Sequence, residues 1–545
     1  MNFSTLDFIV FAVYIIGIVS LGLYVSRTKK GHTKNSQDYF LAGKSLTWWA
    51  IGASLIAANI SAEQIIGMSG SGFAIGLAIA SYEWMAAITL IIVGKYFLPI
   101  FIEKKIYTIP EYIEQRYNTT LKTILAIFWI FLFIFVNLTS VLFLGAKALD
   151  TIIGIGDGSL IVVFIILLGL IAAAYSLYGG LSAVAWTDVV QVILLVFGGI
   201  IATVIALNNV TPEGGLFNGL SHIYDKAGDK FHMILKKGHP EFDNLPGIAV
   251  LIGGMWIANL YYWGFNQYII QRTLAAKSLK ESQKGIAFAA FLKLLIPLIV
   301  VVPGIIAYVM YAQPEGTAVI DGVKESFTKA DGTLNYDKSY PWLISMFIPI
   351  GLKGVIVAAL TAAIVSSLAS MLNSTSTIFT MDIFKPYVDK QASEQKLVRV
   401  GRISAAAALI IAAFSAPLLR SVPQAFQYIQ EYTGVVSPGI LAVAMIGLFW
   451  KKATTKGAIW GAILSIPTAL FLKLDFIGLA WMDEMLYTFL ITLVIIAMIS
   501  LTQSKTDDDP KGIKLTAETF KTEGAFNISA YIILLILALL YTVFW

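Results

Sequence analysis

The chain has 545 residues, of which 58% are hydrophobic and only 13% are charged, and its mean hydropathy is +0.79. A soluble protein of this size needs more charge to cover its surface, so the composition excludes an ordinary soluble globule and favours a protein embedded in lipid. The absence of cysteine excludes disulfides, thiolate metal sites and cysteine nucleophiles. The net charge of +5 comes from basic residues in short segments between apolar runs, which indicates membrane topology rather than nucleic-acid binding.

Apolar segments long enough to cross a bilayer recur along the whole chain. A spanning helix needs about 20 apolar residues, and this length predicts an all-α integral membrane protein with about fourteen transmembrane helices. We expect the first segment to be a retained span rather than a cleaved signal peptide, because it lacks a basic leader. The predicted spans cover residues 7–25, 46–74, 78–102, 122–148, 159–178, 184–206, 247–270, 286–312, 352–383, 402–420, 425–450, 457–473, 485–503 and 526–545.

Basic residues concentrate in alternate loops between these spans. Arg27, Lys104 and Arg272 all fall in odd-numbered loops, each followed closely by further lysines. An excess of Lys and Arg marks the cytoplasmic side, so these loops are predicted to lie inside and both chain termini outside. Two outer loops, residues 208–246 and 313–341, are long and mix charges with Gly and Pro, which predicts solvated connectors with a short helix or two.

Spans 2 and 7 carry polar residues and glycine where a lipid-facing helix would be apolar. Residues 56–64 read Ile-Ala-Ala-Asn-Ile-Ser-Ala-Glu-Gln, and residues 257–267 read Ile-Ala-Asn-Leu-Tyr-Tyr-Trp-Gly-Phe-Asn-Gln. Unpaired polar groups are unfavourable in hydrocarbon, so both helices are predicted to be interrupted. The two spans lie five apart, so a repeat of spans 2–6 in spans 7–11 would be inverted, and interrupted helices of such repeats meet near the midplane around solute and ion. The alternative is glycine packing in an ordinary helix bundle.

Charged and hydroxyl side chains inside the spans are functional candidates, because burying them in a membrane is unfavourable. Glu83 and Lys293 are predicted to pair across the bundle, either as a structural ion pair or with a shared role in binding hydroxyl groups. Span 9 contains Ser366 and Ser367, whose hydroxyls suit sodium when combined with carbonyls of an interrupted helix. Helical serines can instead bond to their own backbone.

Span 11 interleaves aromatic residues with amides over residues 426–432. Amide and charged side chains pair with the hydroxyls of a neutral solute, while an aromatic face covers the apolar side of its ring. The pattern therefore favours a hydroxyl-rich neutral solute. Packing of the aromatic residues in the protein core is the alternative.

These motifs resemble the sodium/solute symporter family over nearly the whole chain, and most closely its bacterial sodium/galactose branch. The resemblance implies a LeuT-like fold, with a core of two inverted five-helix repeats whose first helices are discontinuous and with extra helices beside it. The segments that carry the likeness are residues 57–64, 81–85, 178–181, 186–191, 258–267 and 426–432.

The family likeness also implies a division of the chain. Residues 1–45 would form an extra N-terminal span and inner loop, and 46–207 the first repeat. An outer loop, 208–246, would lead to the second repeat, 247–450, which includes the outer loop 313–341. Residues 451–545 would form three C-terminal spans.

The site residues follow from the resemblance, position by position. The residues implied for sugar binding are Gln64, Glu83, Asn259, Lys293 and Gln430, with Tyr262 stacking on the sugar as an inner gate and with Met68, Tyr82 and Phe426 closing the outer side. Sodium would bind between the carbonyls of Ala57, Ile60 and Ala363 and the hydroxyls of Ser366 and Ser367, with Asp188 along its inward exit. One position departs from the family pattern, since Ala86 stands where the sugar transporter has serine. Because a possible hydroxyl contact is missing, the sequence does not decide whether galactose or glucose is preferred.

The resemblance implies a secondary transporter of the bacterial inner membrane that carries a monosaccharide, galactose or glucose, inward with about one sodium ion per sugar. The partners are then the sugar, sodium and the lipid bilayer, with no nucleic acid. Proton coupling through Glu83 or Asp188 and transport of another small solute are the near alternatives. An enzyme would need clustered acids or a metal site, and a sensor would need an output domain; the sequence indicates neither.

Overall fold

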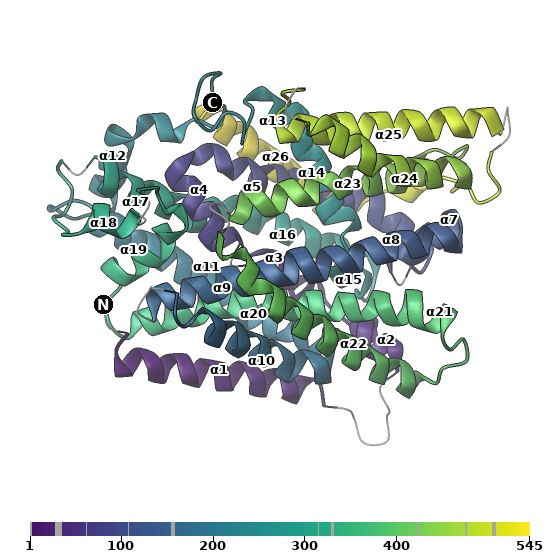
Figure 1. The fold of residues 1–545 in the computed structure, drawn as a ribbon, viewed down its shortest axis with the longest axis horizontal. Coiled ribbons are helices and arrows are strands. Elements are labelled where there is room, and N and C mark those ends of the chain that lie inside the picture. Colours follow the sequence, from purple (N-terminus) through teal and green to yellow (C-terminus); the bar gives the residue numbers. More distant parts are fainter. Residues whose placement is uncertain are drawn as a thin grey trace.

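Figure 1 shows a computed structural model of the chain, in which long helices run along a common axis and pack side by side. The structure describes residues 3–27, 35–61, 63–106, 108–153, 158–313, 315–328, 332–421, 425–474, 477–503 and 508–545, with the backbone alone for residues 63, 175, 421 and 425–428. The all-α fold class predicted from the sequence is confirmed within these residues.

Twelve helical segments in the described part of the chain are long and apolar enough to cross a membrane. Several are pairs of helices joined by a short π-helical turn, a local widening of the helix that leaves its direction nearly unchanged. The segments are formed by α1 (Thr5–Val25), α5 (Ser81–Ile92) with α6 (Leu98–Glu103), α8 (Thr119–Phe131) with α9 (Thr139–Ile152), α10 (Ile161–Gly179), α11 (Leu181–Asn209), α16 (Leu279–Val300) with α17 (Val302–Ala312), α20 (Leu352–Ile378) with α21 (Lys385–Tyr387), α22 (Glu394–Ser415), α23 (Ala425–Phe449), α24 (Thr455–Leu472), α25 (Trp481–Gln503) and α26 (Gly524–Val543).

A thirteenth span is broken in the middle. It comprises α3 (Trp48–Asn59) and α4 (Met68–Ala74), which are bent by 61° at the intervening break. Ile60, directly after α3, has an extended backbone with φ −80° and ψ 93°. The interruption predicted for span 2 is therefore confirmed.

The segment predicted as span 7 forms three short helices instead of one. They are α13 (Ile248–Ile252), α14 (Gly254–Phe265) and α15 (Gln267–Leu274). Asn266 separates the last two with an extended backbone at φ −82° and ψ 118°, so the predicted interruption is confirmed here too. Since none of the three is long enough to span alone, the total of fourteen stays a prediction.

One helix forms the centre of the molecule. The spanning segment that contains α20 is 94% buried, whereas α1 at the periphery is 11% buried. Against α20 pack α11, α10, α22 and α3, and α3 also packs against α16. Small residues permit the closest contacts: a Cβ atom added at Gly304 in α17 would lie 2.0 Å from the carbonyl oxygen of Ser69 in α4.

The two long loops contain short helices, as predicted, but they also pack onto the helical body. In the first loop the Lys230 ammonium donates to the Ala74 carbonyl at the end of α4 and lies 4.4 Å from the centre of the Tyr308 ring. In the second loop the buried Asp337 pairs with Lys147 of α9 at 3.1 Å. The short helices outside the spans are α2 (Ser36–Leu41), α7 (Ile109–Arg116), α12 (Leu216–Lys226), α18 (Val323–Phe327) and α19 (Ser339–Phe347).

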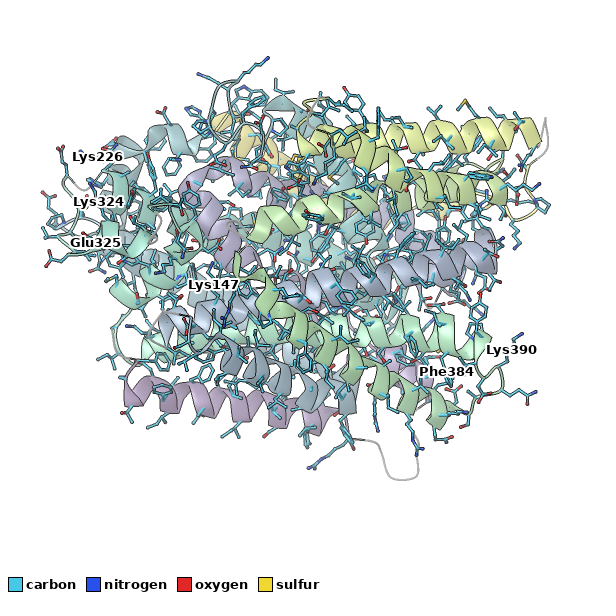
Figure 2. The ribbon with its side chains drawn as sticks, in the orientation of Figure 1. Lys147, Lys226, Lys324, Glu325, Phe384 and Lys390 are labelled. Atoms are coloured by element: carbon cyan, nitrogen blue, oxygen red, sulfur yellow. The ribbon has the colours of Figure 1, made fainter. Side chains whose placement is uncertain are left out.

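Both chain termini lie at the end of the molecule that carries these two loops. The Asp7 carboxylate accepts hydrogen bonds from the backbone of Gly351 and Gly354 at the start of α20, which follows the second loop and α19. The Met233 amide of the first loop donates to the Phe544 carbonyl near the C-terminus. Figure 2 shows Lys226, Lys324 and Glu325 at this end and Phe384 and Lys390 at the opposite end.

Candidate functional site

A polar cavity lies where the two interrupted spans meet. It encloses about 820 Å³ of space between protein atoms, including its opening. Its walls come from the ends of α3 and α14, from α5 and α16, and from α23 and α25, so residues far apart in the sequence converge on it. A polar cavity at the junction of several helices is a typical binding site for a small organic solute.

Buried hydrogen bonds connect the two sides of this cavity. The Lys293 ammonium donates to the Glu83 carboxylate and to the side-chain oxygen of Asn59. The Asn59 amide donates to the Tyr262 hydroxyl at 3.1 Å, and that hydroxyl also accepts from Tyr268 at 2.8 Å. The predicted ion pair across the bundle is confirmed, and because its two charges cancel, the wall offers donors and acceptors without a net charge.

Most of the residues predicted to contact the substrate line this one cavity. The Gln64 side-chain oxygen accepts from the Ser61 hydroxyl at 2.9 Å, and the Asn259 amide donates to the Met255 carbonyl one turn earlier at 3.2 Å. Each amide keeps further hydrogen-bonding capacity for a solute, because a primary amide has two N–H groups and an oxygen with two lone pairs. The predicted residues in the lining are Gln64, Tyr82, Glu83, Asn259, Tyr262, Lys293 and Gln430.

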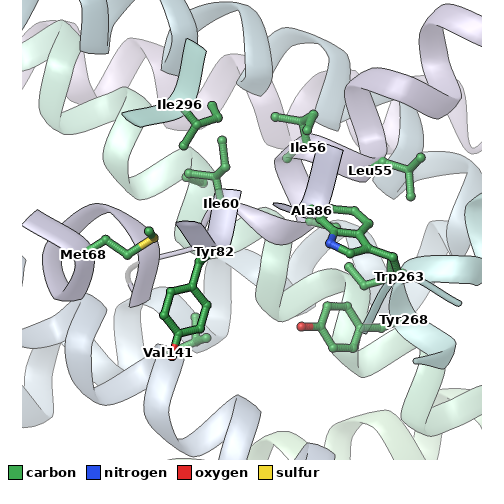
Figure 3. Packing of buried hydrophobic residues seen from close by; sticks show 14 of the residues in the cluster. Leu55, Ile56, Ile60, Met68, Tyr82, Ala86, Val141, Trp263, Tyr268 and Ile296 are labelled. Carbon is green, nitrogen blue, oxygen red and sulfur yellow. The ribbon is translucent and has the colours of Figure 1, made fainter. Parts of the chain in front are cut away.

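The residues predicted to close the outer side are placed in part. Figure 3 shows Met68 on one side of Tyr82 and the pair Trp263 and Tyr268 on the other. Met68 is buried in the apolar core and does not line the cavity. Phe426 belongs to α23, but its side chain lies outside the described part of the structure.

One of the predicted sodium ligands, Ser367, contacts the end of α3 beside the break in the second span. The Ser367 hydroxyl of α20 donates to the Ala58 carbonyl at 3.0 Å and lies 3.5 Å from the Ala57 carbonyl oxygen. Ala363 is one helical turn before Ser367, and Ile60 follows α3 directly. Carbonyl oxygens freed by an interrupted helix beside a hydroxyl are the hard ligands that sodium prefers.

The Ser366 hydroxyl, also predicted as a sodium ligand, has another partner in this structure. It donates to the Asp188 carboxylate, which also accepts from the Ser54 hydroxyl. Asp188 lies 3.6 Å from the guanidinium of Arg272, and all of these groups are fully buried. Sodium binding through Ser366 therefore requires its hydroxyl to be released from, or shared with, this carboxylate.

The expectation that Arg272 lies in an inner loop is wrong. It is the sixth residue of α15, and its guanidinium donates to Ser54, Ser370 and the Tyr268 carbonyl. Basic residues after an apolar run usually mark the membrane surface, but α15 continues the interrupted span into the protein interior. Its neutralising acid, Asp188, is distant in sequence, so a scan of local composition does not reveal the pair.

Several lining residues had no role assigned from the sequence. Trp263, whose ring centre lies 5.1 Å from the Lys293 nitrogen, belongs to the polar aromatic segment 257–267, and Tyr268 follows that segment directly. Trp481 and Met485 lie on α25, outside the two predicted repeats, so nothing in their local sequence linked them to the cavity.

The geometry can be compared with known proteins. Residues 39–465 match the Sodium:solute symporter family. The chain belongs to this family. It is therefore a sodium-coupled symporter and not an enzyme, as the resemblance implied.

Similar proteins extend over nearly the same length. The chain is 62% identical over 542 residues to the sodium/glucose cotransporter of Vibrio parahaemolyticus. This match covers 99% of this chain and 98% of that protein. It is 33% identical over 493 residues to the sodium/myo-inositol cotransporter 2 of Homo sapiens, with 86% of this chain and 70% of that protein covered.

Solved structures share the fold at low sequence identity. A substrate-bound, outward-open sodium-coupled sialic acid symporter matches with a TM-score of 0.77 and 24% identity, over 92% of this chain and 98% of that one. A nucleobase-cation-symport-1 family transporter in a closed conformation matches with a TM-score of 0.54 and 13% identity, over 91% and 99%. These matches support the predicted fold class.

Proposed function

We propose that this protein carries a monosaccharide of the glucose or galactose type into the cell together with sodium. The observation that carries the proposal is the neutral polar cavity built around the Lys293–Glu83 pair. A sugar has many hydroxyls and no charge, so it suits a wall in which charges cancel and amides remain. The name of the Vibrio relative, a sodium/glucose cotransporter, points to the same solute class.

The proposed sugar contacts are the polar residues that line the cavity. Gln64, Asn259 and Gln430 would exchange hydrogen bonds with sugar hydroxyls. Glu83 and Lys293 would do so more strongly, because hydrogen bonds to ionised groups are stronger than neutral ones. Tyr262 would cover the ring and act as the inner gate, since its hydroxyl already joins Asn59 and Tyr268.

The outer side would be closed by apolar side chains once the sugar is bound. Met68, Tyr82 and Phe426 are the proposed closing residues, and their movement would precede opening past Tyr262. A ligand shifts such an equilibrium only through its different affinities for the two states. We therefore expect the sugar to bind the occluded form more tightly than the open one.

Sodium would bind at the junction of α3 and α20. The proposed ligands are the carbonyls of Ala57, Ile60 and Ala363 and the hydroxyls of Ser366 and Ser367, with Asp188 on the path by which the ion leaves. Bound sodium would replace the direct hydrogen bond between Ser367 and the α3 carbonyl. It would thereby fix α3 against α20 in the outward-open state.

One sodium ion per sugar is sufficient energetically. A membrane potential of about 100 mV contributes about 2.3 kcal/mol per ion, and a tenfold sodium gradient adds about 1.4 kcal/mol. Their sum supports a sugar gradient of roughly 500-fold. The energetics therefore require no second ion.

The proposed setting is the inner membrane of a bacterium with both termini outside. Three observations support it: the basic residues of the odd-numbered loops, the position of both termini beside the two long loops, and the bacterial relative. The proposed repeats are residues 46–207 and 247–450, with residues 1–45 and 451–545 as additional spans.

Uptake into proteoliposomes would test the substrate. Labelled galactose, glucose and an uncharged amino acid are offered separately, with sodium or potassium outside. We expect uptake of one or both sugars, only with sodium and unchanged by a pH gradient. Uptake of the amino acid alone would contradict the sugar assignment, and uptake driven by a pH gradient without sodium would contradict sodium coupling.

With Ala86→Ser, we expect a change in the ratio of galactose uptake to glucose uptake, because the new hydroxyl would face the cavity.

A further inference from the structure

We propose that a groove between α16 and α26 binds one anionic phospholipid, with its phosphate on Lys284 and an acyl chain along the apolar wall. The groove lies apart from the sugar cavity and contributes none of its lining. The space within the groove and directly in front of it that protein atoms leave unfilled is about 1070 Å³. Its existence does not depend on which solute is transported.

The walls of the groove are apolar and extend along two helices. Phe288 and Phe291 of α16 form one side, and Phe526 and Ile533 of α26 form the other. Trp48, at the start of α3, completes the lining from a third helix, and its ring packs edge-on against Phe288 with 5.5 Å between ring centres. Ile532 lies seven positions after Ala525, which is about 10 Å along a helix and enough for part of an acyl chain.

The groove opens toward lipid rather than toward an aqueous loop. Phe291 is 45% exposed, Ile532 is 50% exposed and Trp48 is 39% exposed. Because the helices that carry them belong to membrane spans, these exposed apolar side chains face lipid. Tryptophan is enriched at the boundary between headgroups and hydrocarbon, which places this end of the groove near the membrane surface. A bilayer lipid is therefore the molecule with direct access to it.

Lys284 supplies the charge that selects the lipid. It is the sixth residue of α16, about 8 Å along the helix axis, and it is half-buried among apolar side chains. Within the described part of the chain it makes no hydrogen bond or ion pair, whereas the neighbouring Lys280 pairs with Glu523 at 2.8 Å. A cation in an apolar groove is stabilised by an anion, and a lipid phosphate at this depth is within reach of a lysine side chain.

The proposed lipid would join two parts of the molecule. α16 carries Lys293 into the sugar cavity, nine residues beyond Lys284 on the same helix, whereas α26 is the peripheral last helix. The lipid would fill the space between them and hold α26 against α16. We therefore expect removal of the lipid to loosen α26 first.

Native mass spectrometry of the purified full-length protein would test the proposal. The protein is exchanged into detergent containing phosphatidylglycerol or phosphatidylcholine, and the lipid retained is counted. We expect one phosphatidylglycerol per chain and no matching phosphatidylcholine. Lys284→Gln should reduce the retained phosphatidylglycerol about tenfold, which corresponds to one charge-assisted hydrogen bond. Lys277→Gln, which removes the same charge from an exposed position on the same side, should leave it unchanged.

A second variant tests the role of the groove while the charge of Lys284 is kept. Ser529→Phe places an aromatic ring in the groove and keeps Lys284, and it should also remove the lipid. Size-exclusion profiles and sugar uptake show whether each variant is folded. The proposal is overturned if folded Ser529→Phe retains the lipid, if Lys277→Gln loses as much as Lys284→Gln, or if phosphatidylcholine is retained equally.

Discussion

Lys293 and Glu83 are a charged pair held almost entirely away from water. Their side chains are 1% and 3% exposed, and the Asn59 side chain accepts a second hydrogen bond from the ammonium. Buried ion pairs gain little net stability, because desolvation offsets the attraction, but removal of one partner leaves an uncompensated charge. We therefore propose that the pair serves solute binding rather than the stability of the fold.

Lys293→Ala should abolish sugar uptake and lower stability by about 3–5 kcal/mol, because Glu83 loses its partner. The double variant Glu83→Gln with Lys293→Met should recover most of the stability without recovering uptake. Thermal melting in detergent and uptake in proteoliposomes measure the two effects separately. Full uptake by the double variant would show that the pair serves only the fold.

Ser367 joins α20 to the break in the second span through one hydroxyl. Ser367→Ala should raise the sodium concentration that gives half-maximal uptake about tenfold or more, because an oxygen ligand is lost. Thr375→Ala is a matched control, since that hydroxyl on the same helix bonds to the Met371 carbonyl one turn earlier. Equal sodium dependence in both variants would place the sodium site elsewhere.

The interrupted helices are the elements that the sequence predicts best. Polar residues and glycine inside an apolar run indicate a break whatever the neighbours are, and Ile60 and Asn266 have extended backbones where breaks were expected. The partners of buried charges were harder to predict. Arg272 follows an apolar run and so resembles a loop residue, while its acid, Asp188, lies 84 residues away, and only tertiary packing brings the two together.

A short helix at one end of the molecule supports the helix that carries Gln430. The Arg116 guanidinium of α7 donates to the Gly447 carbonyl at 2.9 Å and to the Ala453 carbonyl at 2.8 Å, at the end of α23. The Tyr112 hydroxyl donates to the Ala444 carbonyl at 2.8 Å. The Arg116 donor to Gly447 satisfies one of the carbonyl groups that the end of α23 leaves without a partner in the helix.

Arg116→Lys should destabilise the protein by about 3 kcal/mol, because a lysine cannot reach several carbonyls at once as the planar guanidinium does. Arg420→Lys, at an exposed position, is the matched control and should have no effect. Thermal melting in detergent measures both. An unchanged melting temperature for Arg116→Lys would mean that α7 does not hold the end of α23.

At the scale of the whole molecule, both termini and the two long loops share one end (Figure 1). Because the chain has no cysteine, a single introduced cysteine reports its own side of the membrane. Lys324→Cys should react with a membrane-impermeant maleimide in intact cells, whereas Lys390→Cys at the opposite end should react only after permeabilisation (Figure 2). The reverse pattern would invert the proposed topology.

Sodium-driven sugar accumulation tests the central claim most directly. Proteoliposomes that contain the purified protein are given labelled galactose or glucose under an inward sodium gradient, with a potassium gradient as the control. The account predicts that sugar rises above its external concentration only with sodium, and that Gln64→Ala protein, still folded, does not accumulate it. Equal sugar uptake with potassium, or full accumulation by Gln64→Ala, would contradict it.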